Sequence, residues 1–79
     1  MGLEGQSLSR ATWRAFKRAG ANPRVAEWVR RVANGESVEN VASESGFMVT
    51  TVKQYIMNRR RYFDICKKNG IVPEGGADV

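Results

Sequence analysis

Apolar side chains recur along the chain with the spacing of α-helices. The clearest run is Val25, Trp28, Val29 and Val32, which follow at i, i+3, i+4 and i+7 and therefore share one face of a helix. Less regular runs of the same kind lie before and after it. No segment alternates with a period of two over more than a few residues, as a half-buried strand would. The pattern predicts an all-α fold, a small four-helix domain.

The ends of the four predicted helices are indicated by capping residues and glycines. The helices are expected at about residues 8–18, 23–33, 38–45 and from 50 or 51 to 68. The expected N-caps are Ser7 or Ser9, Asn22, Ser37 and Thr50. Pro23 follows Asn22 at the first helical position, which proline favours. The glycines expected just beyond the last turns are Gly20, Gly35, Gly46 and Gly70.

Length and composition indicate one domain. The chain has 79 residues, of which 42% are hydrophobic, enough for a small core. We expect a flexible lead at residues 1–6, the domain at 7–70 and a flexible tail at 71–79. No run of 18 apolar residues predicts a membrane span, and no signal peptide is recognisable. A cytoplasmic protein, nucleoid-associated when bound to DNA, is therefore expected.

The charge distribution favours a polyanionic partner. The net charge is +5, from 13 basic and 8 acidic residues. Two of the acidic residues, Glu74 and Asp78, lie in the tail, so the first seventy residues carry thirteen basic and six acidic side chains. A field of this sign favours nucleic acid first and an anionic membrane surface second.

Residues for catalysis or metal binding are scarce. The chain has no histidine, which excludes histidine-based acid–base chemistry, and no paired carboxylates or phosphate loop. Its one cysteine, Cys66, cannot form an internal disulfide and is expected to be a small buried residue. We therefore expect neither an enzyme nor a bound cofactor or metal.

The third and fourth predicted helices have the residue spacing of a helix-turn-helix. Such a motif needs a small residue where its helices cross, and Ala42 meets that need. Four positions later Gly46 can adopt the positive φ of the turn. Phe47 is expected to fill the core after the turn, and Val52 and Ile56 to bury the inner face of the second helix.

The outer face of the fourth helix is then free to enter the major groove. The outward residues expected to be free to meet base edges are Met48, Val49, Thr50, Lys53, Gln54 and Met57. Lys53 and Gln54 are candidates for base contacts, because lysine can donate to guanine and glutamine can pair with adenine. Thr50 and Thr51 are candidates for phosphate contacts near the helix start. Two of the three consecutive arginines are expected to reach phosphates, while Arg59 is expected to pack its stem against Tyr62 or Trp28. The full candidate DNA-binding set is Val49, Thr50, Thr51, Lys53, Gln54, Met57, Asn58, Arg60 and Arg61. A solvated charged face is the alternative interpretation of these residues.

About half of the chain resembles a LuxR/NarL/GerE-type DNA-binding domain. The similarity runs through residues 22–37 and continues in Val41-Ala42, Gly46-Phe47 and Thr51-Val52-Lys53. It implies that Thr51, Lys53 and Gln54 face DNA. Three residues depart from the family pattern: Ser45, Met48 and Tyr55.

A looser resemblance links residues 35–63 and the segment Val72-Pro73-Glu74-Gly75 to TrfB/KorA-type plasmid repressors. Both resemblances imply a regulator that binds duplex DNA. The sequence therefore predicts a sequence-specific transcriptional regulator that recognises double-stranded DNA through residues 50–61.

A homodimer is also expected, because one short helix gives limited specificity. It is expected to form through the C-terminal half of the fourth helix or through the first. The alternative function is a protein-interaction module or accessory factor that docks on RNA polymerase, another regulator or a DNA-processing enzyme.

Overall fold

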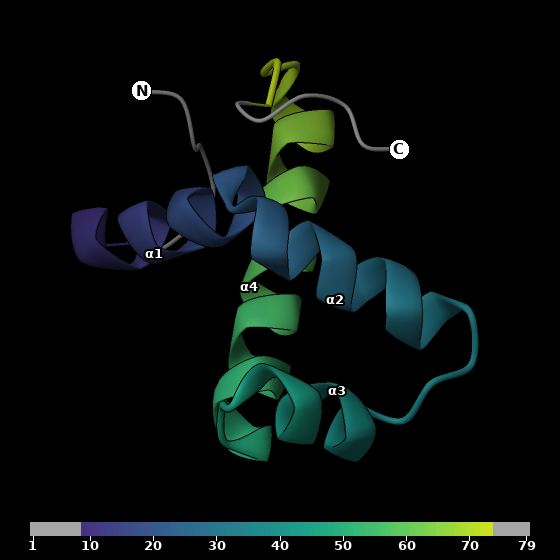
Figure 1. Cartoon of the computed structure of the whole chain (residues 1–79). Coiled ribbons are helices and arrows are strands. Elements are labelled where there is room, and N and C mark those ends of the chain that lie inside the picture. Colours follow the sequence, from purple (N-terminus) through teal and green to yellow (C-terminus); the bar gives the residue numbers. More distant parts are fainter. Residues whose placement is uncertain (1–8, 74–79) are drawn as a thin grey trace.

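Four helices joined by short turns make up the described part of the chain, residues 9–73 of the computed structural model. They are α1 (Arg10–Ala21), α2 (Pro23–Ala33), α3 (Val38–Ser45) and α4 (Val49–Asn69). These residues contain no strand, so the all-α prediction is confirmed. α4 has 21 residues and extends for about 31 Å. The other three helices pack along it, with α3 near its N-terminal end and α1 nearer its C-terminal half (Figure 1). The predicted lead at residues 1–6 and most of the tail lie outside the described residues.

Three of the predicted N-caps are present. The side-chain oxygens of Ser9, Asn22 and Ser37 accept backbone N–H bonds at 3.0, 2.8 and 3.0 Å. Each bond satisfies one of the N–H groups that a helix start leaves without an intrahelical partner. Gly46 and Gly70 follow α3 and α4 with φ of 77° and 67°, as the turns require. The predicted boundaries of α2 and α3 are therefore confirmed.

The prediction for Gly20 was wrong. Gly20 lies inside α1, which continues to Ala21, and it has no positive φ. It is buried against the ring of Tyr62, where a Cβ atom would come within 2.1 Å of Tyr62 Cδ2. Glycine is required here because α1 and α4 approach closely, not because the chain turns.

The start of α4 also differs from the prediction. The helix begins at Val49, and Met48 occupies the N-cap position without any side-chain hydrogen bond. Thr50, the expected cap, therefore lies in the first turn. The chain turns at Gly46, and α4 then begins at Val49, one residue before the hydroxyl of Thr50.

One core cluster joins α2, α3 and the N-terminal half of α4. Its fully buried members are Val25, Trp28, Val41, Ala42, Val52 and Ile56. Phe47 is half-buried and meets the Trp28 ring edge-on at a centroid distance of 5.1 Å. Ser45, which departs from the apolar residue of the family pattern, accepts a hydrogen bond from Trp28 Nε1 at 3.0 Å. The hydroxyl thus satisfies an indole donor that is 2% exposed.

A second cluster fixes α1 to the C-terminal half of α4. It consists of Phe16, Tyr62, Ile65 and Cys66, with Trp13 and Phe63 at its edge. Arg59, which is 6% exposed, adds a polar connection because its Nη1 donates to the Gly20 carbonyl at 2.7 Å. Its guanidinium also lies 4.7 Å from the centroid of the Phe63 ring. The prediction that Cys66 is buried is confirmed. For Arg59 the prediction named Tyr62 or Trp28, whereas the ring beneath its guanidinium is that of Phe63.

Candidate nucleic-acid interface

One face of α4 is covered by none of the other helices. Its exposed residues recur at intervals of three and four and so fall on about a third of the helix circumference. We call this face the α4 stripe, and its members are Thr50, Lys53, Gln54, Met57, Arg60, Arg61, Asp64 and Lys68. Six of the nine predicted DNA-binding residues lie on it. Val52 and Ile56 point the opposite way, into the core.

The other three predicted residues are not on the α4 stripe. Val49 is half-buried and packs against the first core cluster, and Thr51 is half-buried on the flank of the helix. Asn58 is 8% exposed, and its Oδ1 accepts a hydrogen bond from Gln54 Nε2 at 3.1 Å. Asn58 therefore lies on the buried flank of α4 and is not part of the α4 stripe. Asn58 instead holds the side chain of its neighbour on the stripe.

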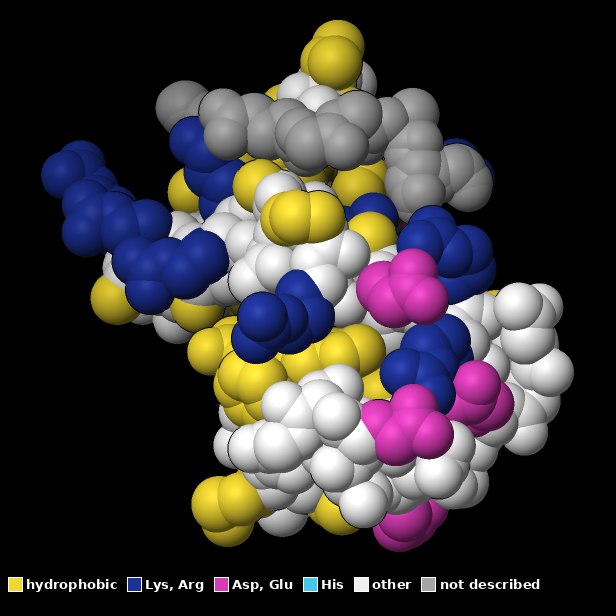
Figure 2. Space-filling view, viewed as in Figure 1, with side chains coloured by type: hydrophobic (Ala, Val, Ile, Leu, Met, Phe, Trp, Pro, Cys, Tyr) yellow, Lys and Arg dark blue, Asp and Glu magenta, His cyan; other side chains and the backbone are white. Residues whose placement is uncertain are grey.

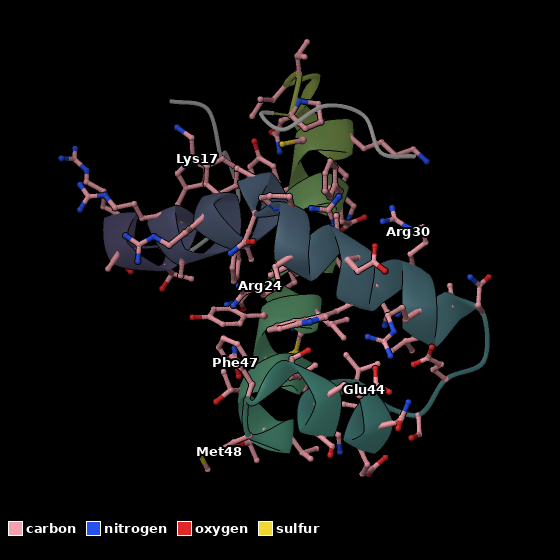
Figure 3. The ribbon with its side chains drawn as sticks, in the orientation of Figure 1. Lys17, Arg24, Arg30, Glu44, Phe47 and Met48 are labelled. Atoms are coloured by element: carbon pink, nitrogen blue, oxygen red, sulfur yellow. The ribbon has the colours of Figure 1, made fainter. Side chains whose placement is uncertain are left out.

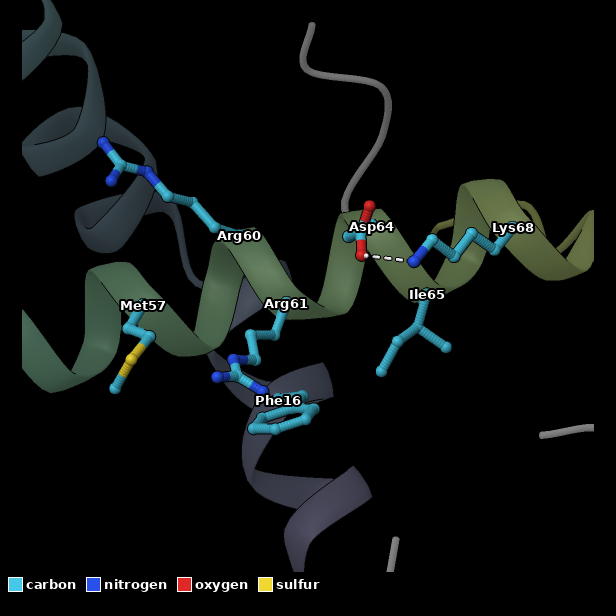
Figure 4. A pocket seen from close by; sticks show the side chains of 7 residues that line it. All are labelled: Phe16, Met57, Arg60, Arg61, Asp64, Ile65 and Lys68. Atoms are coloured by element: carbon cyan, nitrogen blue, oxygen red, sulfur yellow. Dashed lines mark ion pairs between the residues drawn. The ribbon is translucent and has the colours of Figure 1, made fainter. Parts of the chain in front are cut away.

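Positive charge on the α4 stripe is only partly neutralised. Asp64 lies 3.5 Å from Lys68 and forms the ion pair drawn in Figure 4. Lys53, Arg60 and Arg61 have no ion pair within residues 9–73. The N-terminal two thirds of the stripe therefore carries three cations that no carboxylate of the described residues neutralises.

Most of the other carboxylates within residues 9–73 are paired on α2, on α3 or in the turn between them. Arg31 Nη2 lies 2.7 Å from Glu36 Oε1 and also pairs with Glu44, while Arg30 pairs with Glu27. The hydrogen bond from Arg31 lowers the pKa of Glu36 below its usual value, and burial opposes this only in part. Acidic side chains gather over this side of the molecule in Figure 2. These three acidic groups are thus held on α2, on α3 and in the turn between them, away from the stripe.

A groove of about 470 Å³ lies between the C-terminal part of the α4 stripe and α1. Met57, Arg60, Arg61, Asp64, Ile65 and Lys68 line it from α4, and Phe16 lines it from α1 (Figure 4). Its lining combines apolar side chains with three cations. α1 therefore borders the stripe directly.

Met48 was predicted among the outward residues of the fourth helix but left out of the candidate DNA-binding set. Its side chain is 70% exposed and projects from the molecule immediately before α4 (Figure 3). Met57, which lies further along α4 on the stripe, is 44% exposed. The signal in the sequence was an apolar residue at an N-cap position, where it can neither cap the helix nor join its buried face. Behind it, Phe47 is held between Trp28 and the guanidinium of Arg24, which lies 5.5 Å from the Phe47 ring centroid.

Comparisons with family models, curated proteins and solved structures find no match to this chain. The LuxR/NarL/GerE-type and TrfB/KorA-type resemblances thus stay predictions. Among residues 9–73, no helix is long and apolar enough to cross a bilayer. The same residues contain no group of three or more histidine, cysteine or carboxylate side chains placed to hold a metal ion.

Proposed function

We propose that this chain is a sequence-specific double-stranded DNA-binding transcriptional regulator. In this proposal α3, the turn at Gly46–Met48 and α4 form a helix-turn-helix, and the α4 stripe enters the major groove. The observation that carries the proposal is the stripe itself: an uncovered helix face with polar and cationic side chains, held on a rigid core by its opposite face.

The dimensions of α4 suit a major groove. The groove is about 12 Å wide and 8.5 Å deep and accepts one α-helix. Lys53 and Gln54 lie about one turn from the start of α4, where recognition helices usually contact bases. Gln54 is presented by its hydrogen bond from Nε2 to Asn58, which leaves its amide oxygen free to accept from an adenine amino group.

Phosphate contacts are expected at both ends of the base-contacting region. At the start of α4, Met48 provides no side-chain cap, so first-turn N–H groups remain for a phosphate together with the Thr50 hydroxyl. Further along, Arg60 and Arg61 lack carboxylate partners among the described residues. These contacts set the position of the protein on the duplex and carry no base information.

Alanine variants tested on a duplex selected by the wild type distinguish these roles. Lys53→Ala is expected to weaken the selected duplex by about 10-fold and unrelated duplexes much less, since a base contact contributes about 1–3 kcal/mol. Arg61→Ala is expected to weaken binding to the selected and the unrelated duplexes to the same degree. It should also lower the slope of log K against log salt concentration by about one. Arg30→Ala, which removes a cation already paired with Glu27 on α2, is the matched control. Equal effects of Lys53→Ala and Arg30→Ala would refute this placement of α4.

A homodimer remains part of the proposal, but the buried side of the C-terminal half of α4 is no longer a candidate for the dimer surface. Tyr62, Ile65 and Cys66 on the C-terminal half of α4 are buried against α1 of the same chain, so they are not available to a second copy without rearrangement. We therefore expect a dimer to use other surfaces. Sedimentation equilibrium with and without a selected duplex tests this, and a 1:1 complex on a single half-site would contradict it.

A protein-interaction module, for example one docking on RNA polymerase or another regulator, is the second candidate. It is favoured by the exposed thioethers of Met48 and Met57, since methionine is common on adaptable protein-binding surfaces. Under this alternative, Met57→Ala lowers the affinity for the protein partner. Lys53→Ala then changes only DNA binding that has no sequence preference in the wild type.

A further inference from the structure

The exposed side of α1 carries a row of arginines. Arg10, Arg14 and Arg18 are spaced at i, i+4 and i+8, and all three are exposed. Residues spaced in this way lie above one another on one face of a helix, about 6 Å apart along the axis. α1 contains no acidic residue, and within residues 9–73 none of the three arginines has an ion pair. Figure 2 shows basic side chains gathered at the end of α1 that projects from the body of the molecule.

Such a row is unfavourable for the helix by itself. Like charges at i and i+4 repel, and a cation near a helix N-terminus opposes the helix dipole. Arg10 is the first residue of α1 and has both disadvantages. A polyanion bound along the row would remove the repulsion.

The row is also fixed in position. Phe16 and Gly20, on the other side of α1, are buried against α4, and Arg59 of α4 donates to the Gly20 carbonyl at 2.7 Å. α1 also borders the groove at the C-terminal end of the α4 stripe. The arginines therefore belong to the same rigid body as the proposed recognition helix.

We propose that the Arg10, Arg14 and Arg18 row is a second nucleic-acid site, which binds the phosphate backbone of duplex DNA outside the part read by α4. This inference rests on the proposed function. The phosphates can belong to flanking DNA of the same duplex or to a second duplex. An anionic membrane fits less well, because Phe16 and Ala19, the apolar residues that would enter lipid, are buried against the rest of the chain.

Salt dependence of binding to a selected duplex tests the proposal. Each phosphate contact contributes about 0.9 to the slope of log K against log salt. Arg14→Gln is expected to lower the slope by about one, and the triple Arg10→Gln, Arg14→Gln, Arg18→Gln variant by about two to three, with the selected sequence motif unchanged. Arg30→Gln, an exposed single-charge change on α2, is the matched control and is expected to leave the slope as in wild type. Glutamine keeps the helix propensity, and circular dichroism of each variant verifies folding.

Two further arms separate the sources of the phosphates. A triple-variant effect that grows when flanking DNA is added to the selected site indicates the same duplex. A labelled duplex captured on an immobilised duplex by wild type, but not by the triple variant, indicates a second duplex. The proposal is overturned if the triple variant has the wild-type salt slope on every duplex. It is also overturned if the triple variant loses binding to anionic vesicles while its DNA binding stays as in wild type. If the wild type itself binds no DNA, the proposed function has failed. That result differs from the two outcomes for the triple variant that overturn only the second site.

Discussion

Replacing Gly20 by alanine tests the close contact between α1 and α4. A Cβ at this position would lie 2.1 Å from Cδ2 and 2.6 Å from Cε2 of Tyr62. Ordinary contact between carbon atoms needs about 3.5 Å, so one side must move by more than an ångström. The Tyr62 ring cannot easily do so, because it is 2% exposed and lies 5.3 Å, between ring centroids, from both Trp13 and Phe63.

The expected cost follows from two opposing effects. Over-packing a core costs about 1–3 kcal/mol and sometimes more, and a contact this short belongs at the upper end. Alanine is favoured over glycine in a helix by about 1 kcal/mol. Gly20→Ala should therefore lower the free energy of unfolding by about 2 kcal/mol. Movement of α1 would also stretch the hydrogen bond from Arg59 to the Gly20 carbonyl, which adds to the loss.

Urea unfolding followed by circular dichroism measures this change, with Ala15→Gly as the reverse substitution at an exposed position of α1. Helix propensity alone predicts opposite effects for the two variants, whereas the packing argument predicts that both are destabilised. In a Tyr62→Leu background, which removes the ring edge, the cost of Gly20→Ala should shrink. An unchanged or higher urea midpoint for Gly20→Ala would refute the reasoning.

Three further predictions concern single contacts. Ser45→Ala should lower stability by about 1–2 kcal/mol, because it leaves the buried Trp28 N–H without its acceptor; a urea midpoint equal to wild type would contradict this. Because the folded-state pKa of Glu36 is lowered by Arg31, its ion pair stabilises the fold above the unfolded pKa and is lost as the pH falls through the folded one. Thermal unfolding should therefore show a loss between about pH 5 and pH 3 that is smaller in Glu36→Gln. Burial raises the pKa of the Cys66 thiol, so a thiol reagent should label native protein slowly and urea-unfolded protein at the rate of a free cysteine; rapid labelling of the native state would show that α1 does not cover it.

The boundaries of α2 and α3 could be predicted because the interactions that set them are local. A capping serine or asparagine bonds to an N–H two or three residues away, as Asn22 and Ser37 do. The positive φ of Gly46 likewise depends on the turn in which it lies. Such information is contained in a few consecutive residues.

Gly20 was misassigned because the reason for it is not local. A glycine near the end of a helical run resembles a C-cap, and only the folded chain places Tyr62, forty-two positions later, against it. The burial of Asn58 was likewise not evident from its neighbours in the sequence. Asn58 is a polar residue between Met57 and three arginines, and the helical period places it on the flank of α4, where it is buried.

The α4 stripe could be predicted in most of its members, since the inward residues Val52 and Ile56 determine the opposite face. The segregation of charge could not. Net charge does not indicate that Arg31 holds both Glu36 and Glu44. Glu36 lies in the turn that follows α2, but Glu44 meets Arg31 only when α2 packs on α3. Ion pairing of this kind holds three carboxylates on the side of α2 and α3, away from the α4 stripe and the arginine row of α1.

The most direct measurement of the central proposal is selection from a pool of random duplex DNA at physiological salt. It is run in parallel for wild type, Lys53→Ala and Arg30→Ala. The proposal predicts that wild type and Arg30→Ala enrich the same motif, while Lys53→Ala loses it or changes it at one position. No enrichment by folded wild-type protein, with only salt-sensitive binding, would contradict a sequence-specific regulator that reads DNA through α4.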